Sequence, residues 1–131
     1  MREALGVCHT VIVEEKMDKE TGDKYFVYNA SSPDELALVN GAKHLGFSFD
    51  ERDADGFMCC KIESSDEMLK YQLLNVIEFD STRKRMTIIV RRPNNEVLVI
   101  CKGADSIIEK RLHPNQTILE QTNSYLNSFA K

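Results

Sequence analysis

Residues 78–86 read Glu78-Phe79-Asp80-Ser81-Thr82-Arg83-Lys84-Arg85-Met86, and the rest of the chain is organised around them. They place an aromatic ring, two hydroxyl groups and three consecutive cations between two apolar runs, residues 71–77 and 87–90. Both runs are rich in β-branched and other apolar side chains, which favours strands. The sequence therefore predicts that the basic stretch connects two neighbouring strands at one edge of a sheet.

The next connection predicts how the chain returns to that edge. Residues 93–96 read Pro-Asn-Asn-Glu, which is turn chemistry between two further apolar stretches. If Arg92 pairs with Val97, the antiparallel register places Lys102 opposite Thr87. Lys102 then lies at the same end of the sheet as the basic stretch.

An aromatic ring and two cations thus converge from distant parts of the sequence. Phe79 offers a face on which a base can stack, and the ammonium groups of Lys84 and Lys102 can bind phosphate. This combination predicts a nucleotide site. The alternative interpretation is a buried phenylalanine beside a solvated basic turn, since aromatic side chains at strand ends usually belong to the core.

Composition indicates one globular domain and excludes several function classes. The 131 residues are 42% hydrophobic and 29% charged, which suffices for one core. The net charge of −4 weighs against a protein that coats nucleic acid. No apolar run approaches the roughly 20 residues of a membrane span, and the N-terminus lacks the layout of a signal peptide.

Metal and P-loop chemistry are not expected. The four cysteines show no C-x-x-C spacing and the three histidines form no cluster, so a zinc site is disfavoured. The acids at 50–55 lack the ligand spacing of a calcium loop. No Gly-x-x-x-x-Gly-Lys-Ser/Thr motif is present, which disfavours a self-sufficient kinase. The unpaired cysteines fit a reducing, cytosolic setting.

Apolar periodicity predicts an α+β domain in which helices flank an antiparallel sheet of about six to seven strands. Strands are expected at residues 11–13, 25–28, 47–49, 57–62, 71–77, 87–90 and 97–100. Residues 3–7 are either a short helix or the start of a strand. Further helices are expected from Pro33, from Ala104 to Arg111, and after Thr117, which would cap the last helix.

The helix that begins at Pro33 carries a second candidate site residue. Ser32 is a good N-cap, Pro33 suits the first helical position, and Glu35 stands three residues after the cap, as in a capping box. Gly46 should end the helix. Capping and the helix dipole alone account for an acid at this place. The alternative is that Glu35 accepts a hydrogen bond from an amino group, such as N6 of adenine.

Gly103 is a third candidate, because it stands between Lys102 and the start of the next helix. A glycine lets the backbone approach a ligand closely, and a helix N-terminus offers free N–H groups to a phosphate or a ring nitrogen. The alternative is an ordinary turn glycine.

Three motifs together resemble the nucleotide-binding domain of the P-type ATPases, and more narrowly its phospholipid-flippase branch, the P4-ATPases. They are Ser31-Ser32-Pro33-Asp34-Glu35-Leu36-Ala37-Leu38-Val39, then residues 78–87, then Cys101-Lys102-Gly103-Ala104-Asp105. Cation pumps tend to have Lys-Gly-Ala-Pro-Glu at the third motif. The resemblance spans nearly the whole chain, from Cys8-His9-Thr10 to the final helix, and the set is specific although each motif alone is weak.

The resemblance implies a domain that binds ATP and delivers its γ-phosphate to an aspartate on a neighbouring domain. No catalytic residue is expected in this chain. Leu36 and Ser81 depart from the family pattern, since flippases often have Gly or Ala at the first position and calcium pumps have an arginine at the second. By resemblance, Phe79 stacks on adenine, Glu35 contacts its amino group, Ser81 lines the ring and ribose, Lys102 sits at the inner wall of the pocket near the ring and the α-phosphate, and Lys84 faces the phosphates.

The resemblance also implies a larger parent protein. Residues 1–131 are expected to be a single nucleotide-binding domain, a fragment of a multi-domain, multi-pass membrane ATPase, on its cytoplasmic side. The Asp-Lys-Thr-Gly-Thr phosphorylation motif and a Gly-Leu-Arg-Thr-Leu segment are absent from the sequence. The chain alone is therefore expected to bind ATP, with Mg²⁺ accompanying the nucleotide in the full-length protein, and not to hydrolyse it. Expected partners are ATP or ADP and the phosphorylation and actuator domains, with phospholipid and membrane reached only through the parent and no nucleic acid.

Two other function classes stay open on the residues alone. A sheet that bears an aromatic ring beside several arginines is typical of single-stranded RNA-binding modules, although the acidic balance and the lack of a second aromatic next to Phe79 oppose it. The other is a protein-interaction domain in which the three motifs are structural. In that case Phe79 should be buried and its replacement by alanine should cost roughly 3–5 kcal/mol of stability.

Overall fold

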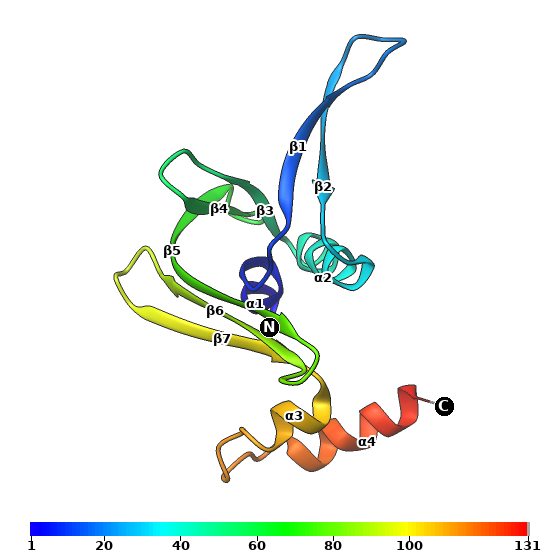
Figure 1. Ribbon diagram of the computed structural model, residues 1–131, viewed down its shortest axis with the longest axis vertical. Coiled ribbons are helices and arrows are strands. Elements are labelled where there is room, and N and C mark those ends of the chain that lie inside the picture. The colour runs from blue at the N-terminus through cyan, green and yellow to red at the C-terminus, as the bar shows by residue number, and fades with distance from the viewer. Residues whose placement is uncertain (131) are drawn as a thin grey trace.

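The computed structural model describes residues 1–130 and confirms the predicted antiparallel α+β fold (Figure 1). The strands in this range form a two-stranded sheet, β1-β2, and a five-stranded sheet in the order β3-β4-β5-β6-β7. No helix in this range is both long and apolar enough to cross a membrane. The elements are α1 (Arg2–Val7), β1 (Ile12–Met17), β2 (Lys24–Asn29), α2 (Pro33–His44), β3 (Phe47–Arg52), β4 (Phe57–Ile62), β5 (Glu67–Asp80), β6 (Arg85–Arg91), β7 (Val97–Gly103), α3 (Asp105–Glu109) and α4 (Leu119–Phe129).

Local sequence signals set both ends of α2, as predicted. The side chain of Ser32 accepts a hydrogen bond from the backbone N–H of Glu35 at 3.2 Å, and Pro33 occupies the first turn. Gly46 follows the helix with a φ of +79°, a conformation that glycine adopts without steric cost. The N-terminus of α2 is therefore fixed at the place where Glu35 leaves the helix.

The predicted register between β6 and β7 is wrong by one residue. Val97 pairs with the residue before Arg92, so Lys102 lies opposite Met86 and not opposite Thr87. Residues that are directly opposite in an antiparallel pair project from the same face of the sheet. The correction therefore places Lys102 beside Met86, on the face that is buried.

A shorter turn than expected causes this shift. The backbone N–H of Arg92 donates to the carbonyl of Glu96 at 2.9 Å, which leaves only residues 93–95 in the loop. Asn95 has a φ of 68°, the left-handed conformation that commonly completes three-residue hairpin loops. Pro93 and the two asparagines mark the turn in the sequence, but they do not reveal its length.

A bulge in β5 changes the direction of Phe79. The pairing of β5 with β6 shifts by one residue between Ile77 and Asp80, so β5 contains one extra residue there. In a regular strand Phe79 would share a face with Ile77. Bulges break this alternation and re-aim side chains. Here both Glu78 and Phe79 border the cavity described below.

The core lies between one face of the five-stranded sheet and the helices α1 and α2 (Figure 1). Residues 3–7, for which helix and strand were both open, belong to the helix α1. Val7 and Val39 contribute from the two helices, and Ile88 and Val90 contribute from β6. All four side chains are fully buried. This packing holds the N-terminus of α2 against the sheet end that carries the candidate site.

The opposite face of the sheet and the C-terminal helices are less covered. Val97 and Val99 of β7 are exposed. The helices α3 and α4 lie beyond the end of the sheet in Figure 1, and neither contains a buried residue. The prediction that Thr117 caps α4 is wrong, because Ile118 is the N-cap and no side chain caps this helix.

Candidate functional site

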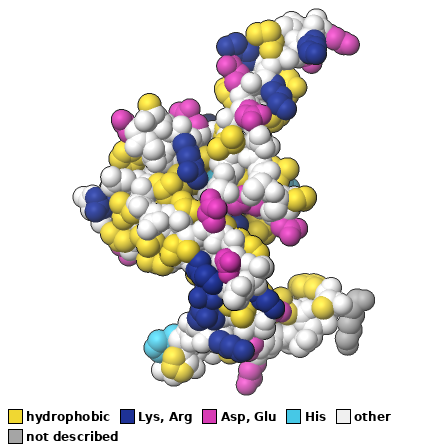
Figure 2. Space-filling model, in the orientation of Figure 1, with side chains coloured by type: hydrophobic (Ala, Val, Ile, Leu, Met, Phe, Trp, Pro, Cys, Tyr) yellow, Lys and Arg dark blue, Asp and Glu magenta, His cyan; other side chains and the backbone are white. Residues whose placement is uncertain are grey.

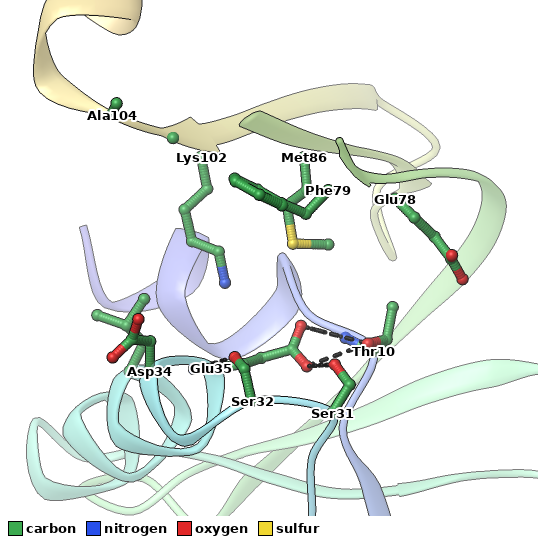
Figure 3. A pocket seen from close by; sticks show the side chains of 12 residues that line it. Thr10, Ser31, Ser32, Asp34, Glu35, Glu78, Phe79, Met86, Lys102 and Ala104 are labelled. Carbon is green, nitrogen blue, oxygen red and sulfur yellow. Dashed lines mark hydrogen bonds between the residues drawn. The ribbon is translucent and has the colours of Figure 1, made fainter. Parts of the chain in front are cut away.

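A cavity of about 570 Å³ lies where the N-terminus of α2 meets the ends of β5 and β7 (Figure 3). Four of the six predicted site residues line it, and Ser81 and Lys84 do not. The whole lining comprises Thr10, Ser31, Ser32, Asp34, Glu35, Leu38, Glu78, Phe79, Met86, Lys102, Gly103 and Ala104. Since these residues come from distant parts of the sequence, only the folded chain forms the cavity.

Phe79 presents an open aromatic face to this cavity. Its side chain is 64% exposed, so the interpretation of Phe79 as a buried core residue is wrong. Figure 3 shows the ring beside the side chain of Met86, which is almost fully buried. A planar ligand stacked on Phe79 would therefore remove apolar surface from water on one side of the ring, while the core supports the strand behind it.

Lys102 extends from β7 into the cavity, and its amine points toward the side where Glu35 lies (Figure 3). The Nζ atom is buried and has no hydrogen-bond partner among residues 1–130. It also takes part in none of the ion pairs formed by these residues. A buried donor without an acceptor raises the free energy of the folded chain. A ligand that brought an acceptor to this atom would remove that cost.

Glu35 is 7% exposed and its carboxylate is held by three donors. The backbone N–H of Thr10 donates to Oε1 at 2.8 Å, and the Thr10 hydroxyl donates to Oε2 at 3.0 Å. The hydroxyl of Ser31 lies 3.3 Å from Oε2. Glu35 therefore ties α2 to Thr10 and does not close a capping box on Ser32. A carboxylate accepts about four hydrogen bonds, so capacity for one more remains.

Gly103 lies close to the chain's own backbone. A side-chain Cβ at this position would stand 2.5 Å from the carbonyl oxygen of Lys84. That same oxygen accepts a hydrogen bond from the backbone N–H of Ala104 at 3.1 Å. The close approach that suggested a ligand is therefore made by the loop between β5 and β6, which it fixes at the rim of the cavity.

The loop between β5 and β6 supplies the positive charge near this rim. Ser81 and Lys84 are exposed in it and lie outside the lining. The side chain of Asp80 accepts hydrogen bonds from the backbone N–H groups of Thr82 and Arg83 at 2.9 and 2.8 Å, which shapes the turn. Figure 2 shows Lys and Arg side chains gathered on this face around the end of the sheet and the start of the C-terminal helices.

Eight residues of the lining were not predicted as site residues, and Thr10, Ser31 and Met86 are three of them. Thr10 binds a carboxylate 25 positions away, and no local pattern signals such a contact. Ser31 directly precedes the N-cap Ser32. A second hydroxyl residue at the start of a helix is the only local feature of the sequence that points to Ser31. Met86 closes the basic stretch and becomes visible as a cavity residue only through the corrected register.

A buried polar layer supports Thr10 from the side of the core. The His9 ring is fully buried, lies 2.9 Å from the carbonyl of Gly6 through Nε2, and accepts the N–H of Val11 through Nδ1 at 3.1 Å. Burial lowers the pKa of His9 to about 4. Arg52 donates to the carbonyl of His9 at 3.3 Å, and burial lowers its pKa as well. These contacts hold the backbone on both sides of Thr10.

The arrangement offers binding groups for a planar, polar ligand. It combines an exposed ring, a buried donor and a carboxylate acceptor, which are the groups that recognise a nucleobase by stacking and by its edge. Within residues 1–130 no group of three or more His, Cys, Asp and Glu side chains is placed to hold a metal ion.

The comparison with known families decides which domain this is. The family model described as "P-type ATPase, cytoplasmic domain N" matches residues 2–121. The chain belongs to this family. The resemblance drawn from the three motifs is thereby confirmed, including its narrower branch, because the similar curated proteins are phospholipid-transporting ATPases.

Three of these phospholipid-transporting ATPases, from a mammal, an amphibian and a yeast, show the extent of the match. The chain is 42% identical over 127 residues to phospholipid-transporting ATPase ID of Mus musculus, which is 96% of this chain and 10% of that protein. It is 42% identical over 126 residues to phospholipid-transporting ATPase IC of Xenopus tropicalis, 96% of this chain and 9% of that protein. It is 41% identical over 129 residues to phospholipid-transporting ATPase dnf2 of Schizosaccharomyces pombe, 97% of this chain and 9% of that protein. The chain thus spans about a tenth of the length of these relatives.

Proposed function

We propose that this domain N binds ATP in the cavity between α2, β5 and β7, and presents it to a phosphorylatable aspartate on a separate domain of a phospholipid-translocating ATPase. The observation that carries the proposal is that the exposed Phe79 ring lines the same cavity as the buried amine of Lys102, which has no hydrogen-bond partner within residues 1–130. The ring favours a stacked base, and the amine requires a hydrogen-bond acceptor.

The residues present fit an adenine nucleotide. The cavity volume of about 570 Å³ is within the range of roughly 300–1,000 Å³ that is usual for small-molecule sites. Phe79 would cover one face of the adenine ring. Glu35 has acceptor capacity for its amino group, and Lys102 would donate to a ring nitrogen or to the α-phosphate.

The phosphates would extend from the cavity toward the loop between β5 and β6. The carbonyl of Lys84 is bonded to the backbone next to Gly103, so the loop stands at the rim. In the proposal the ammonium group of Lys84 faces the phosphates, and Ser81 lines the ribose from the same loop. Mg²⁺ would supply charge neutralisation on the phosphate oxygens as it travels with the nucleotide.

Transfer of phosphate to an aspartate is nucleophilic catalysis that this chain does not perform in the proposal. Its role is to bind and orient ATP. The phosphorylation and actuator domains of the parent chain, the phospholipid and the membrane are reached through that parent, and the domain itself lies on the cytoplasmic side. The names of the phospholipid-transporting relatives support this assignment.

Binding should be weak. One stacked base contributes roughly 1–3 kcal/mol and each polar contact roughly 1 kcal/mol, which gives about 4–5 kcal/mol in total. This corresponds to a dissociation constant on the order of 0.1–1 mM. ATP is abundant in cells, so such a site is occupied and still releases ADP quickly.

Titration of the isotopically labelled chain with ATP, followed by backbone amide NMR signals, tests the proposal. We expect the signals of Phe79, Lys102 and Glu35 to shift and saturate in the millimolar range. Phe79→Ala should weaken ATP binding about tenfold with little loss of stability, because the ring is already exposed. Phe129→Ala, which removes an exposed ring of α4 far along the chain, should leave ATP affinity unchanged.

Lys102→Met separates the role of the amine from that of its aliphatic chain. It should weaken ATP binding and leave the chain as stable as before or slightly more stable, since it removes a buried donor that has no partner in the described part of the chain. Signals that stay in place at several millimolar ATP, or variants that bind as well as the unmodified chain, would refute the proposed function.

A further inference from the structure

Thr10 is held in a position from which it orients one group of the candidate site, the carboxylate of Glu35. It lies in the short link between α1 and β1, between His9 and Val11, which are both fully buried. The His9 ring bonds to Gly6 and to the N–H of Val11, and Arg52 donates to the carbonyl of His9. The backbone of Thr10 is therefore held from both sides, and its side chain faces the cavity.

Both donors of Thr10 are used on a single carboxylate. The backbone N–H donates to Glu35 Oε1 at 2.8 Å, and the hydroxyl lies 3.0 Å from Oε2 and 3.3 Å from Oε1. This two-point contact fixes the plane of the carboxylate and not only its distance. Ser31 adds a single, longer contact of 3.3 Å to Oε2. Figure 3 shows the carboxylate held between Thr10 and Ser31, below the amine of Lys102.

The oriented carboxylate and the amine of Lys102 do not pair with each other. No ion pair within residues 1–130 includes either group. An acceptor and a donor therefore face one cavity with a gap between them. A purine that carries an amino group next to an unprotonated ring nitrogen has the complementary donor and acceptor. A purine without that amino group can satisfy the amine only.

We propose that Thr10 is a positioning residue: by its two hydrogen bonds it aims the carboxylate of Glu35 at the exocyclic amino group of the base, and so gives the site its preference for 6-aminopurine nucleotides. This inference rests on the proposed function, and it adds the residue that sets base selectivity. Thr10 does not touch the base. A purely structural role would change the affinity for all nucleotides alike, whereas a positioning role changes the affinity only where the amino group is present.

The test compares ATP with purine riboside triphosphate, which lacks the 6-amino group, on the unmodified chain and on Thr10→Val, by NMR titration. Valine keeps the shape and the backbone N–H but removes the hydroxyl. We expect Thr10→Val to weaken ATP binding about three- to tenfold and the analogue less than about twofold. Thr10→Ser, which restores the hydroxyl, should return ATP affinity to within about twofold. Thr122→Val, the same change on the exposed face of α4, should alter neither affinity.

Ser31→Ala is a second variant that removes one weaker contact and leaves the Thr10 backbone untouched. It should weaken ATP binding about two- to threefold and weaken binding of the analogue less. If Thr10→Val does not fold, Ser31→Ala provides the test instead. Equal weakening of both nucleotides in these variants, or no loss of ATP binding, would overturn the inference. If the unmodified chain binds ATP and the analogue equally well, base selectivity fails while ATP binding stands; if it binds neither, the proposed function itself fails.

Discussion

Phe79 and Lys102 each occupy an environment that their chemistry disfavours. The ring is 64% exposed to water, and the amine is buried without a hydrogen-bond partner among residues 1–130. Natural sequences are otherwise locally consistent, and departures of this kind concentrate at functional sites. A stacked base would relieve the first conflict and an acceptor on the base or phosphate the second. Two residues that are unfavourable alone thus become favourable together when a nucleotide is bound.

Gly103 carries a prediction about stability at the same scale. A Cβ here would stand 2.5 Å from the Lys84 carbonyl oxygen and 2.5 Å from the Arg85 Cβ, and backbone cannot move aside cheaply. Gly103→Ala should therefore destabilise the chain by about 1–3 kcal/mol, as overpacking does. The loop at the cavity rim should shift as well. Urea unfolding measures the first effect and ATP titration the second.

Gly41 provides the matched control, because a Cβ there meets no atom within 4 Å and the residue lies inside α2. Gly41→Ala should stabilise the chain by about 0.5–1 kcal/mol through its higher helix propensity. Equal effects of the two substitutions would show that the approach of the Lys84 carbonyl is not a constraint.

His9 predicts a pH dependence of stability. Burial lowers its pKa from 6.5 to about 4, so between these values the unfolded chain binds more protons than the folded one. Stability should be independent of His9 above about pH 6.5, fall as the pH drops, and lose about 3 kcal/mol in total by pH 4. Unfolding by urea at pH 7, 6 and 5 measures this slope.

Two histidine variants isolate the slope from other groups. His9→Asn removes the buried titrating ring, so its stability should change less between pH 7 and 5 than that of the unmodified chain. His113→Asn, at an exposed position, should retain the original slope. The prediction is wrong if the three proteins lose stability in parallel.

At the scale of elements, one carboxylate fastens α1 to the far end of the sheet. Glu3 of α1 accepts from Nε and Nη2 of Arg92, at 2.9 and 2.7 Å, and from the Tyr71 hydroxyl at 3.0 Å. The hydrogen bonds from Arg92 lower the pKa of Glu3. Arg92 also bonds to Glu96 in its own turn. The hairpin between β6 and β7 is thereby tied to the helix that leads into Thr10.

Glu3→Gln should therefore cost about 1–3 kcal/mol of stability, because a half-buried guanidinium and a buried tyrosine both lose a charged acceptor. Glu96→Gln, which alters the exposed partner of the same arginine, should cost clearly less stability than Glu3→Gln, because solvent screens that pair. Denaturant unfolding of both variants gives the comparison. A smaller loss for Glu3→Gln than for Glu96→Gln would contradict this account of the clamp.

At the scale of the whole molecule, the elements are packed against one another to different extents. The inner face of the five-stranded sheet packs against α1 and α2, whereas the β1-β2 hairpin extends away from the body and α3 and α4 lie beyond the sheet end (Figure 1). The 11 residues of α4 include none that is buried. Isolated helices of this length are marginal in water, so packing would have to supply what propensity does not.

Amide hydrogen exchange should reproduce this gradient. We expect the slowest exchange in β4, β5 and β6, whose backbone groups are paired on both sides, and the fastest exchange in α4 and at the tip of the β1-β2 hairpin. Saturating ATP should slow exchange around Lys102 and the N-terminus of α2, and leave α4 unaffected. Protection of α4 equal to that of β5 would contradict the gradient.

Local chemistry determined much of the fold. Ser32, Pro33 and Gly46 set the ends of α2 through capping, which depends only on neighbouring residues. The strands were visible in their apolar runs. The exact register was not, because the loop at 93–95 and the bulge before Asp80 depend on backbone conformations that several sequences share. A shift of one residue changes which side chains face one another across the sheet. The sequence pattern alone therefore does not predict these contacts.

The sequence by itself determined the family, the α+β class and four residues that line one cavity, because these follow from motifs and periodicity along the chain. Only the tertiary structure decided that Phe79 is exposed, that the amine of Lys102 has no partner among the described residues 1–130, and that Thr10 holds Glu35. These properties depend on the distances and solvent access between segments that are far apart in sequence. Such distances are fixed by packing, and a linear pattern does not contain them.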